Sequence, residues 1–108
     1  MNKKDQQSIK IKTVMKAIND KFTVESEFED TEGQGYFTGV IKYDDEVFNI
    51  DLSRRDFSVI VYEVPFQEFN KSAASKLEDE LDMVIEDALQ EAEQNIMMLK
   101  VNEGLGIR

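Results

Sequence analysis

Histidine, cysteine and tryptophan are absent from the 108 residues, and proline occurs once, at Pro65. Without histidine or cysteine the chain forms no disulfide, no thiolate or imidazole zinc site, and no Ser-His-Asp or Cys-His nucleophile system. Without cysteine the sequence is also silent on the redox state of its compartment. These absences turn attention from nucleophilic and zinc chemistry toward recognition.

Long hydrophobic runs are missing as well. The longest uncharged apolar run, residues 57–62, is far shorter than the ~20 residues of a membrane-spanning helix. Lysines interrupt the apolar residues that follow the basic start of the chain, so no secretory signal is expected. The sequence therefore predicts a cytoplasmic protein without a membrane segment.

Charge of one sign dominates what is present. The chain has 23 Asp and Glu against 13 Lys and Arg, a formal net charge of −10, and 41% of its residues are hydrophobic. A chain of this length forms one small domain that buries roughly 60–65% of its unfolded surface. We expect a single domain over residues 1–108, with flexible ends at 1–4 and 102–108.

The hydrophobic period predicts a helix, four strands and a second helix. A 3.6-residue period over about residues 5–20 is typical of an amphipathic helix with a basic outer face. The period then changes to two over residues 22–29, which predicts a strand with one acidic face. Three further strands are expected at 36–43, 47–52 and 57–64, the last being the most apolar and a central strand, ended by Pro65.

The last helix gives the clearest pattern, because apolar residues recur every three or four positions from Leu77 to Ile96. Ser75 to Glu78 matches a capping box, while Asn70 or Ser72 would cap an earlier start. We expect this helix to run to about residue 100, with Gly104 as a terminator beyond its end.

Short connections between the strands favour an antiparallel meander, since parallel neighbours need a crossover of a dozen or more residues. The predicted fold class is α+β. It is a two-layer sandwich in which an N-terminal and a long C-terminal helix flank a four-stranded antiparallel meander sheet, in the order αββββα.

Charge is segregated along the chain. Six lysines against two aspartates leave +4 in residues 1–21, and three basic against twelve acidic residues leave −9 in 22–70. Four basic against nine acidic residues leave −5 in 71–108. The basic first helix is therefore expected to face an acidic surface of a second copy.

The acidic residues form two candidate partner-binding groups. Four acids of the last helix fall within ~80° of each other at 100° per residue, and like charges at i, i+4 destabilise an isolated helix by ~0.2–0.5 kcal/mol per pair. These acids form either a solvated face or a surface for a basic partner. The candidate residues are Glu78, Asp79, Asp82, Glu86 and Glu93 on the last helix, and Glu25, Glu27 and Glu29 on the first strand.

Other charged clusters predict no chemistry. The acids at 44–46 lack the alternating spacing and the glycine of a calcium loop, so we expect a solvated turn and no metal site. No pair of carboxylates stands out for acid–base catalysis, so we expect no enzyme, no catalytic residue and no cofactor. Arg54 and Arg55 either hold a phosphate or pair with Asp51 or Asp56.

Nucleic acid is not expected as a direct partner. The element order resembles that of double-stranded RNA-binding domains, which carry a basic cluster on the last helix. Here the last helix is acidic and repels phosphates.

The end of the chain is apolar. Met97, Met98, Leu99, Val101, Leu105 and Ile107 either pack back on the domain or form a dimer contact suited to flexible methionines.

The remaining function classes are binding proteins. The chain resembles small phage-encoded inhibitors, including acidic anti-CRISPR and nuclease-inhibitor proteins, in size, charge and element order. That resemblance implies a phage- or mobile-element-encoded inhibitor that engages the basic surface of a partner as a nucleic-acid mimic. In size and pI the chain also resembles small secretion chaperones, which implies an acidic adaptor acting as a homodimer on partner segments.

Overall fold

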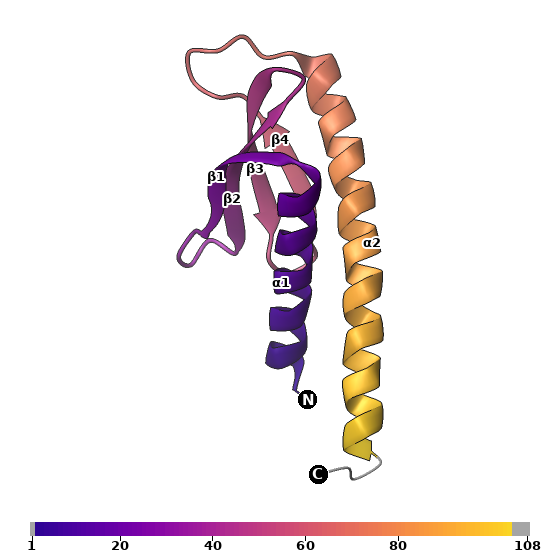
Figure 1. Cartoon of the computed structure of the whole chain (residues 1–108). Helices are drawn as coiled ribbons and strands as arrows, with labels where there is room; N and C mark the ends of the chain where they lie inside the picture. Colours follow the sequence, from indigo (N-terminus) through magenta and orange to yellow (C-terminus); the bar gives the residue numbers. More distant parts are fainter. Residues whose placement is uncertain (1, 105–108) are drawn as a thin grey trace.

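The computed structural model describes residues 2–104 of the chain (Figure 1). Its elements follow in the order α1 (Lys3–Lys21), β1 (Thr23–Asp30), β2 (Tyr36–Tyr43), β3 (Glu46–Ser53), β4 (Val59–Tyr62) and α2 (Lys71–Gly104). All three strand pairs are antiparallel and the sheet order is β1-β2-β3-β4. The predicted α+β class and the meander are confirmed.

Local signals define the ends of α1. The side chain of Asn2 accepts a hydrogen bond of 2.8 Å from the backbone N–H of Asp5, which satisfies one of the free donors of the first turn. At the other end Phe22 adopts an extended conformation, and its N–H donates to the carbonyl of Ile18. Val14 and Ile18 lie on the buried face between these ends, as the 3.6-residue period predicts.

The β2–β3 hairpin is the regular centre of the sheet. Its strands pair without interruption from Tyr36 opposite Ser53 to Tyr43 opposite Glu46. Asp44 and Asp45 form the two-residue connection with φ of 51° and 62°. Positive φ at both central positions is the requirement of a type I′ turn, whose twist matches that of the strands.

One sheet face and the two helices share a single core. Ile41 of β2 and Phe48, Ile50 and Leu52 of β3 are buried together with α1 and α2 side chains. The helix residues buried in that core include Val14, Ile18, Leu77, Leu81 and Ile85. Figure 1 shows both helices beside the same face of the sheet, with α1 antiparallel to α2. This is the predicted two-layer arrangement, and it leaves the other sheet face uncovered by any described element.

The prediction for the last strand is wrong in length and position. Residues 57–64 were expected as a central strand, whereas β4 covers four residues and lies at the sheet edge. Phe57 has a left-handed φ of 61° and belongs to the preceding turn. Val59 faces the core and is buried. The next residue, Ile60, lies on the opposite face and is 62% exposed, so burial accounts for only part of the apolar character of this strand.

α2 begins earlier and ends later than its capping box and glycine indicated. Asn70 caps it, since its side-chain oxygen accepts a hydrogen bond of 3.1 Å from the N–H of Ala73. Ser75 therefore lies inside the helix, and Gly104 belongs to its last turn. At ~1.5 Å per residue, the 34 residues of α2 span ~51 Å, which accounts for most of the 57 Å length of the molecule.

Lys3 and Lys4, within the expected flexible start, belong to α1, and residues 102–104 belong to α2. Leu105 and Ile107 of the apolar end lie outside the described residues.

Candidate protein-binding surface

The acidic residues predicted on α2 are all exposed. Leu77, Leu81 and Ile85 turn toward the core, and at 100° per residue this places the acids of positions 78, 82 and 86 beside that stripe. We call Glu78, Asp79, Asp82 and Glu86 the α2 acidic face. Among the described residues, no cation lies within 4.0 Å of these four carboxylates.

Glu93 differs from the other predicted acids on α2. Its carboxylate lies 3.9 Å from the ammonium of Lys10 on α1. The side chain of Glu93 is 69% exposed, and such exposed pairs contribute about 0–1 kcal/mol to stability. Glu93 is therefore partly engaged within the chain.

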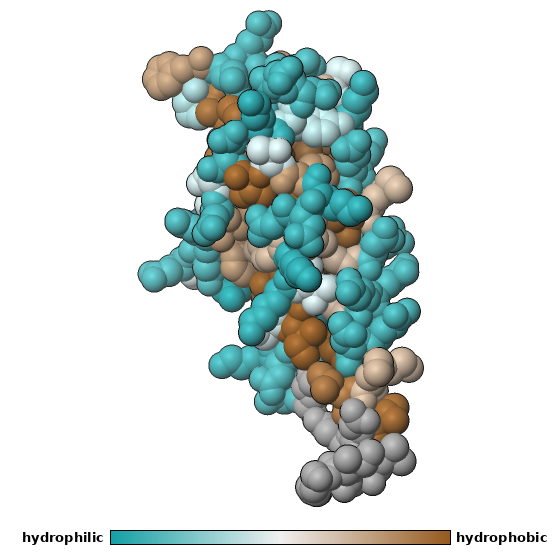
Figure 2. All heavy atoms as spheres, viewed as in Figure 1, coloured by the Kyte–Doolittle hydropathy of each residue, from teal (hydrophilic) through white to brown (hydrophobic). Residues whose placement is uncertain are grey.

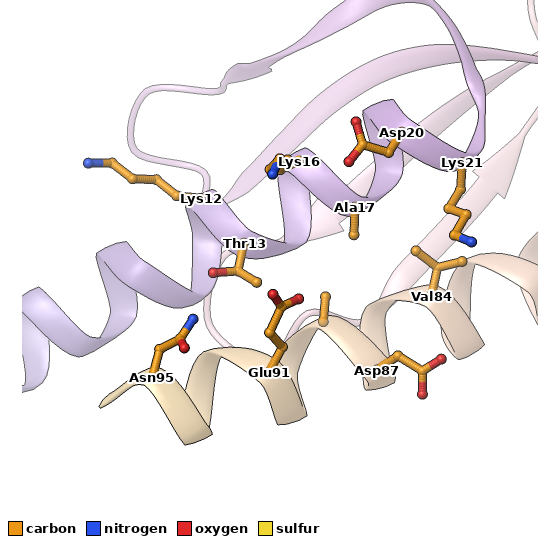
Figure 3. A pocket seen from close by; sticks show the side chains of 11 residues that line it. Lys12, Thr13, Lys16, Ala17, Asp20, Lys21, Val84, Asp87, Glu91 and Asn95 are labelled. Carbon is orange, nitrogen blue, oxygen red and sulfur yellow. The ribbon is translucent and has the colours of Figure 1, made fainter. Parts of the chain in front are cut away.

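A groove of about 580 Å³ runs along the junction of α1 and α2 (Figure 3). Lys12, Lys16 and Lys21 of α1 line it together with Asp87 and Glu91 of α2. Figure 3 shows Glu91 pointing toward α1 and Lys21 pointing toward α2. The lysines of α1 thus lie beside acids of the same chain, and the acids of α2 divide into a group near lysines and the α2 acidic face.

The alternating sequence predicts that β1 presents its acids on one face. The strand pairing interrupts that face. Val24 pairs with Ile41, but Ser26 pairs with Val40, so one extra residue, Glu25, bulges from the strand. A second register shift follows between Ser26 and Glu29. The carboxylates of Glu25, Glu27 and Glu29 are exposed, yet the bulges break the two-residue alternation.

The two predicted acidic groups lie apart. β1 is one edge of the sheet, and α2 packs against α1 and β4, the opposite edge. Figure 1 shows β1 and α2 on opposite sides of the molecule. The fold therefore does not combine Glu25, Glu27 and Glu29 with the α2 acidic face.

Sequence reasoning missed an exposed apolar stretch that begins in β4. Ile60 is 62% exposed, Tyr62 is 37% exposed, and Phe66 in the following loop is fully exposed with a φ of 67°. In contrast, Phe69 of the same loop packs edge-on against Phe48, with ring centroids 6.1 Å apart. Residues 59–62 are uniformly apolar or aromatic, so their sequence contains no signal for the exposed side chains; only the alternating burial in β4 shows an inward and an outward face.

Tyr62 is held on the open face of the sheet. Its hydroxyl donates to the carboxylate of Asp51 at 3.0 Å, and the side chain of Asn49 donates to the carbonyl of Glu63. A hydrogen bond with Thr38 lowers the pKa of Tyr62, but desolvation and the charge of Asp51 outweigh it and raise the pKa above its usual value. These bonds anchor the end of β4 to β3.

The apolar end of α2 is exposed too. Met97, Met98, Leu99 and Val101 lie on the surface, and of the stretch only residues 97–101 are described. Figure 2 shows apolar side chains gathered toward the lower end of the helix pair, on a face that is otherwise largely polar. Within residues 2–104 these four side chains keep between 42% and 68% of their surface exposed.

Arg54 pairs with a carboxylate that the sequence did not indicate. Its guanidinium lies 2.9 Å from Asp30 and above the ring of Phe37. Asp56 instead accepts hydrogen bonds from the N–H and hydroxyl of Ser58, and these bonds lower the pKa of Asp56.

Residues 2–104 contain neither a metal-binding cluster nor a membrane-spanning helix. No cluster of three or more metal-binding side chains lies in this part of the chain. Likewise, neither described helix is apolar enough over its length to span a bilayer.

Comparison of the chain with protein-family models, with curated proteins and with solved structures found no match.

Proposed function

We propose that this protein is a non-enzymatic inhibitor, phage- or mobile-element-encoded, that binds the basic surface of a nucleic-acid-handling protein as a nucleic-acid mimic. The observation that carries the proposal is the α2 acidic face, four exposed carboxylates with no cation of the described residues within 4.0 Å. Like charges at i, i+4 cost a helix ~0.2–0.5 kcal/mol per pair, and a cationic partner relieves that cost.

The spacing of these carboxylates supports mimicry. Glu78, Asp82 and Glu86 follow one another every four residues, a rise of ~6 Å along the helix axis. Phosphates along one strand of B-DNA rise ~3.4 Å per nucleotide, so this rise is close to that of two nucleotides. A groove lined with lysine and arginine for nucleic acid offers cations at a compatible spacing.

Charge and anchors have separate roles in such a complex. The net charge of −10 speeds the encounter with a basic surface and orients it. Affinity in protein interfaces comes mainly from a few buried aromatic or aliphatic anchors. The exposed Phe66 and Ile60 are suited to that role.

A second candidate function is an acidic adaptor, resembling secretion chaperones, that acts as a homodimer on partner segments. The observation that favours it is the exposed apolar residues of β4 and of the end of α2. Adaptors of this kind bind through apolar patches and sheet edges.

Two double charge reversals test the inhibitor proposal. Asp82→Lys with Glu86→Lys changes the α2 acidic face, and Glu25→Lys with Glu27→Lys changes β1 by the same net charge. We expect the α2 double variant to capture at least about tenfold less of the basic partners from a host lysate, whereas the β1 double variant captures them like the parent protein. Quantitative mass spectrometry measures the capture, and circular dichroism checks that each variant folds.

Salt and a polyanion provide the companion test. Capture should fall between low salt and about 0.5 M salt, where charges more than a few ångströms apart are screened, and a DNA oligonucleotide should compete for the partner. If capture survives salt, the oligonucleotide and the α2 reversal, the inhibitor proposal is wrong. Loss of capture only on changing β4 or the end of α2 would support the adaptor.

A further inference from the structure

The outer edge of β4 carries unpaired backbone groups. Ser53 and Ser58 form a hydrogen-bonded pair at the start of the β3–β4 ladder, with an N···O distance of 2.9 Å. Such pairs alternate along antiparallel strands, so Ile60 and Tyr62 direct their N–H and C=O groups to β3. Val59 and Val61 direct theirs away from the sheet, where no residue of 2–104 bonds to them.

The two edges of the sheet differ in their protection. Natural sheets block unwanted strand pairing with bulges and charged side chains on edge strands. β1 has two register shifts and four acids within eight residues. β4 has four uncharged residues, VIVY, in an unbroken register with β3. Only β4 is therefore a regular, uncharged edge to which another strand can add.

The surroundings of β4 define the chemistry of that strand. An added strand lies ~4.8 Å beyond β4, with successive side chains on opposite faces of the sheet. On the open face its neighbours are Ile60 and Tyr62, which favour apolar side chains. On the other face α2 packs over β4. The groove toward α1 is lined by Asp87 and Glu91. At 100° per residue the α2 acidic face falls on the opposite flank of the buried stripe, away from α1, where its carboxylates favour lysine or arginine.

We infer that β4 accepts an extended segment of the partner protein, with alternating apolar and basic residues, as a fifth strand of the sheet. This inference rests on the proposed function insofar as the partner is basic. It adds the binding mode, in which the backbone of Val59 and Val61 supplies hydrogen bonds and the α2 acidic face selects for charge.

A second copy of this chain is a poorer occupant of the edge. Antiparallel pairing of two β4 strands about a two-fold axis makes one continuous sheet with both α2 helices on the same face. The two α2 acidic faces then approach each other across the junction, and like charges repel. A basic segment replaces that repulsion by attraction.

Amide hydrogen exchange by NMR tests the inference directly. The probe is a seven-residue peptide in which lysine and valine alternate, and the control is the same peptide with glutamate in place of lysine. We expect the lysine peptide to slow exchange of the Val59 and Val61 amides at least about tenfold, since each gains a hydrogen bond. The Ile60 and Tyr62 amides, already bonded to β3, should change little, and the glutamate peptide should have no effect.

The α2 double reversal, Asp82→Lys with Glu86→Lys, separates the two proposals. Weaker binding of the lysine peptide to this variant, together with slowed exchange at Val59 and Val61 in the parent protein, supports strand addition. Binding that depends on Asp82 and Glu86 but leaves exchange at Val59 and Val61 unchanged overturns strand addition and leaves the proposed function intact. If the Val59 and Val61 amides are protected without peptide and lose protection on dilution, a second copy occupies the edge and the inference is wrong.

Discussion

At the scale of single residues, two phenylalanines with left-handed backbones have opposite environments. Phe57, with a φ of 61°, is 6% exposed, and its N–H donates to the carbonyl of Ser53 at 3.0 Å. Burial of its ring offsets the ~1–2 kcal/mol that a left-handed conformation costs. Phe66 has a similar φ of 67° but is fully exposed, so no burial within the described structure offsets its cost. Phe66 thus keeps a left-handed backbone and an exposed ring, and its use as an anchor belongs to the proposed function.

Gly39 is required by a close approach of a ring. A Cβ atom added at Gly39 would lie 2.8 Å from the ring of Phe28, which packs across β2 from β1. We expect Gly39→Ala to reduce the free energy of unfolding by about 1–3 kcal/mol, the usual cost of overpacking. Chemical denaturation measures the change.

The matched control for Gly39 is the same substitution in a Phe28→Ala background. Without the ring, Gly39→Ala should cost much less, because the atoms that clash are gone. Equal costs in both backgrounds would contradict the proposed contact.

At the scale of elements, the start of α2 depends on capping rather than on the amphipathic pattern. The apolar period alone does not mark the first residue of the helix. The helix starts after Asn70, whose side-chain oxygen and backbone carbonyl accept hydrogen bonds from the N–H groups of Ala73 and Ala74. The connection from β4 to α2 is then only residues 63–70, and Phe69 in it packs on the core. The cap therefore helps to set where α2 starts over the sheet.

Substitution of the two candidate caps separates them. Asn70→Ala should lower the free energy of unfolding by about 1 kcal/mol, since the N–H of Ala73 loses its acceptor. Ser75→Ala should change stability by less than about 0.5 kcal/mol, because Ser75 is exposed within the helix. Thermal unfolding followed by circular dichroism measures both, and a larger loss at Ser75 would show that the capping box is used after all.

At the scale of the whole molecule, folding changes the distribution of charge that the sequence shows. The +4 of residues 1–21 suggests a basic end, but antiparallel packing lays α1 along the acidic α2. Lys12, Lys16 and Lys21 then share a groove with Asp87 and Glu91. The lysines of α1 thus have acids of the same chain nearby, the contact of a basic end with a second copy stays a prediction, and the net negative charge is concentrated on the α2 acidic face and β1.

Salt should stabilise a molecule with this excess of one charge. The Debye length falls from about 30 Å at 0.01 M to about 3 Å at 1 M salt, which screens repulsion among the exposed carboxylates. We expect the Tm to rise with sodium chloride over this range, and to rise less in the α2 double reversal, whose net charge is smaller. A Tm that falls with salt would mean that pairs such as Lys10–Glu93 outweigh the repulsion.

For some features the local sequence was sufficient to predict the structure. The sequence predicts a strand at residues 36–43, and β2 has these same bounds, because the segment is rich in the β-branched and aromatic residues that favour strands. The meander followed from the short connections, and the exposure of the α2 acids followed from the 3.6-residue period. These features are local, so the sequence by itself determined them.

Only the tertiary structure decided which strand lies at the edge, where β1 bulges, and which acids have cationic neighbours. An apolar run such as residues 59–62 has the same pattern in a central strand and in an edge strand under a helix, since in both places one face packs on the core, as buried Val59 and partly buried Val61 do here. The bulge at Glu25 depends on its pairing with β2, and the neighbours of Glu91 and Glu93 depend on how α1 lies against α2. Each of these features depends on a contact between segments far apart in the chain, and the hydrophobic pattern of one segment does not show which distant segment it will contact.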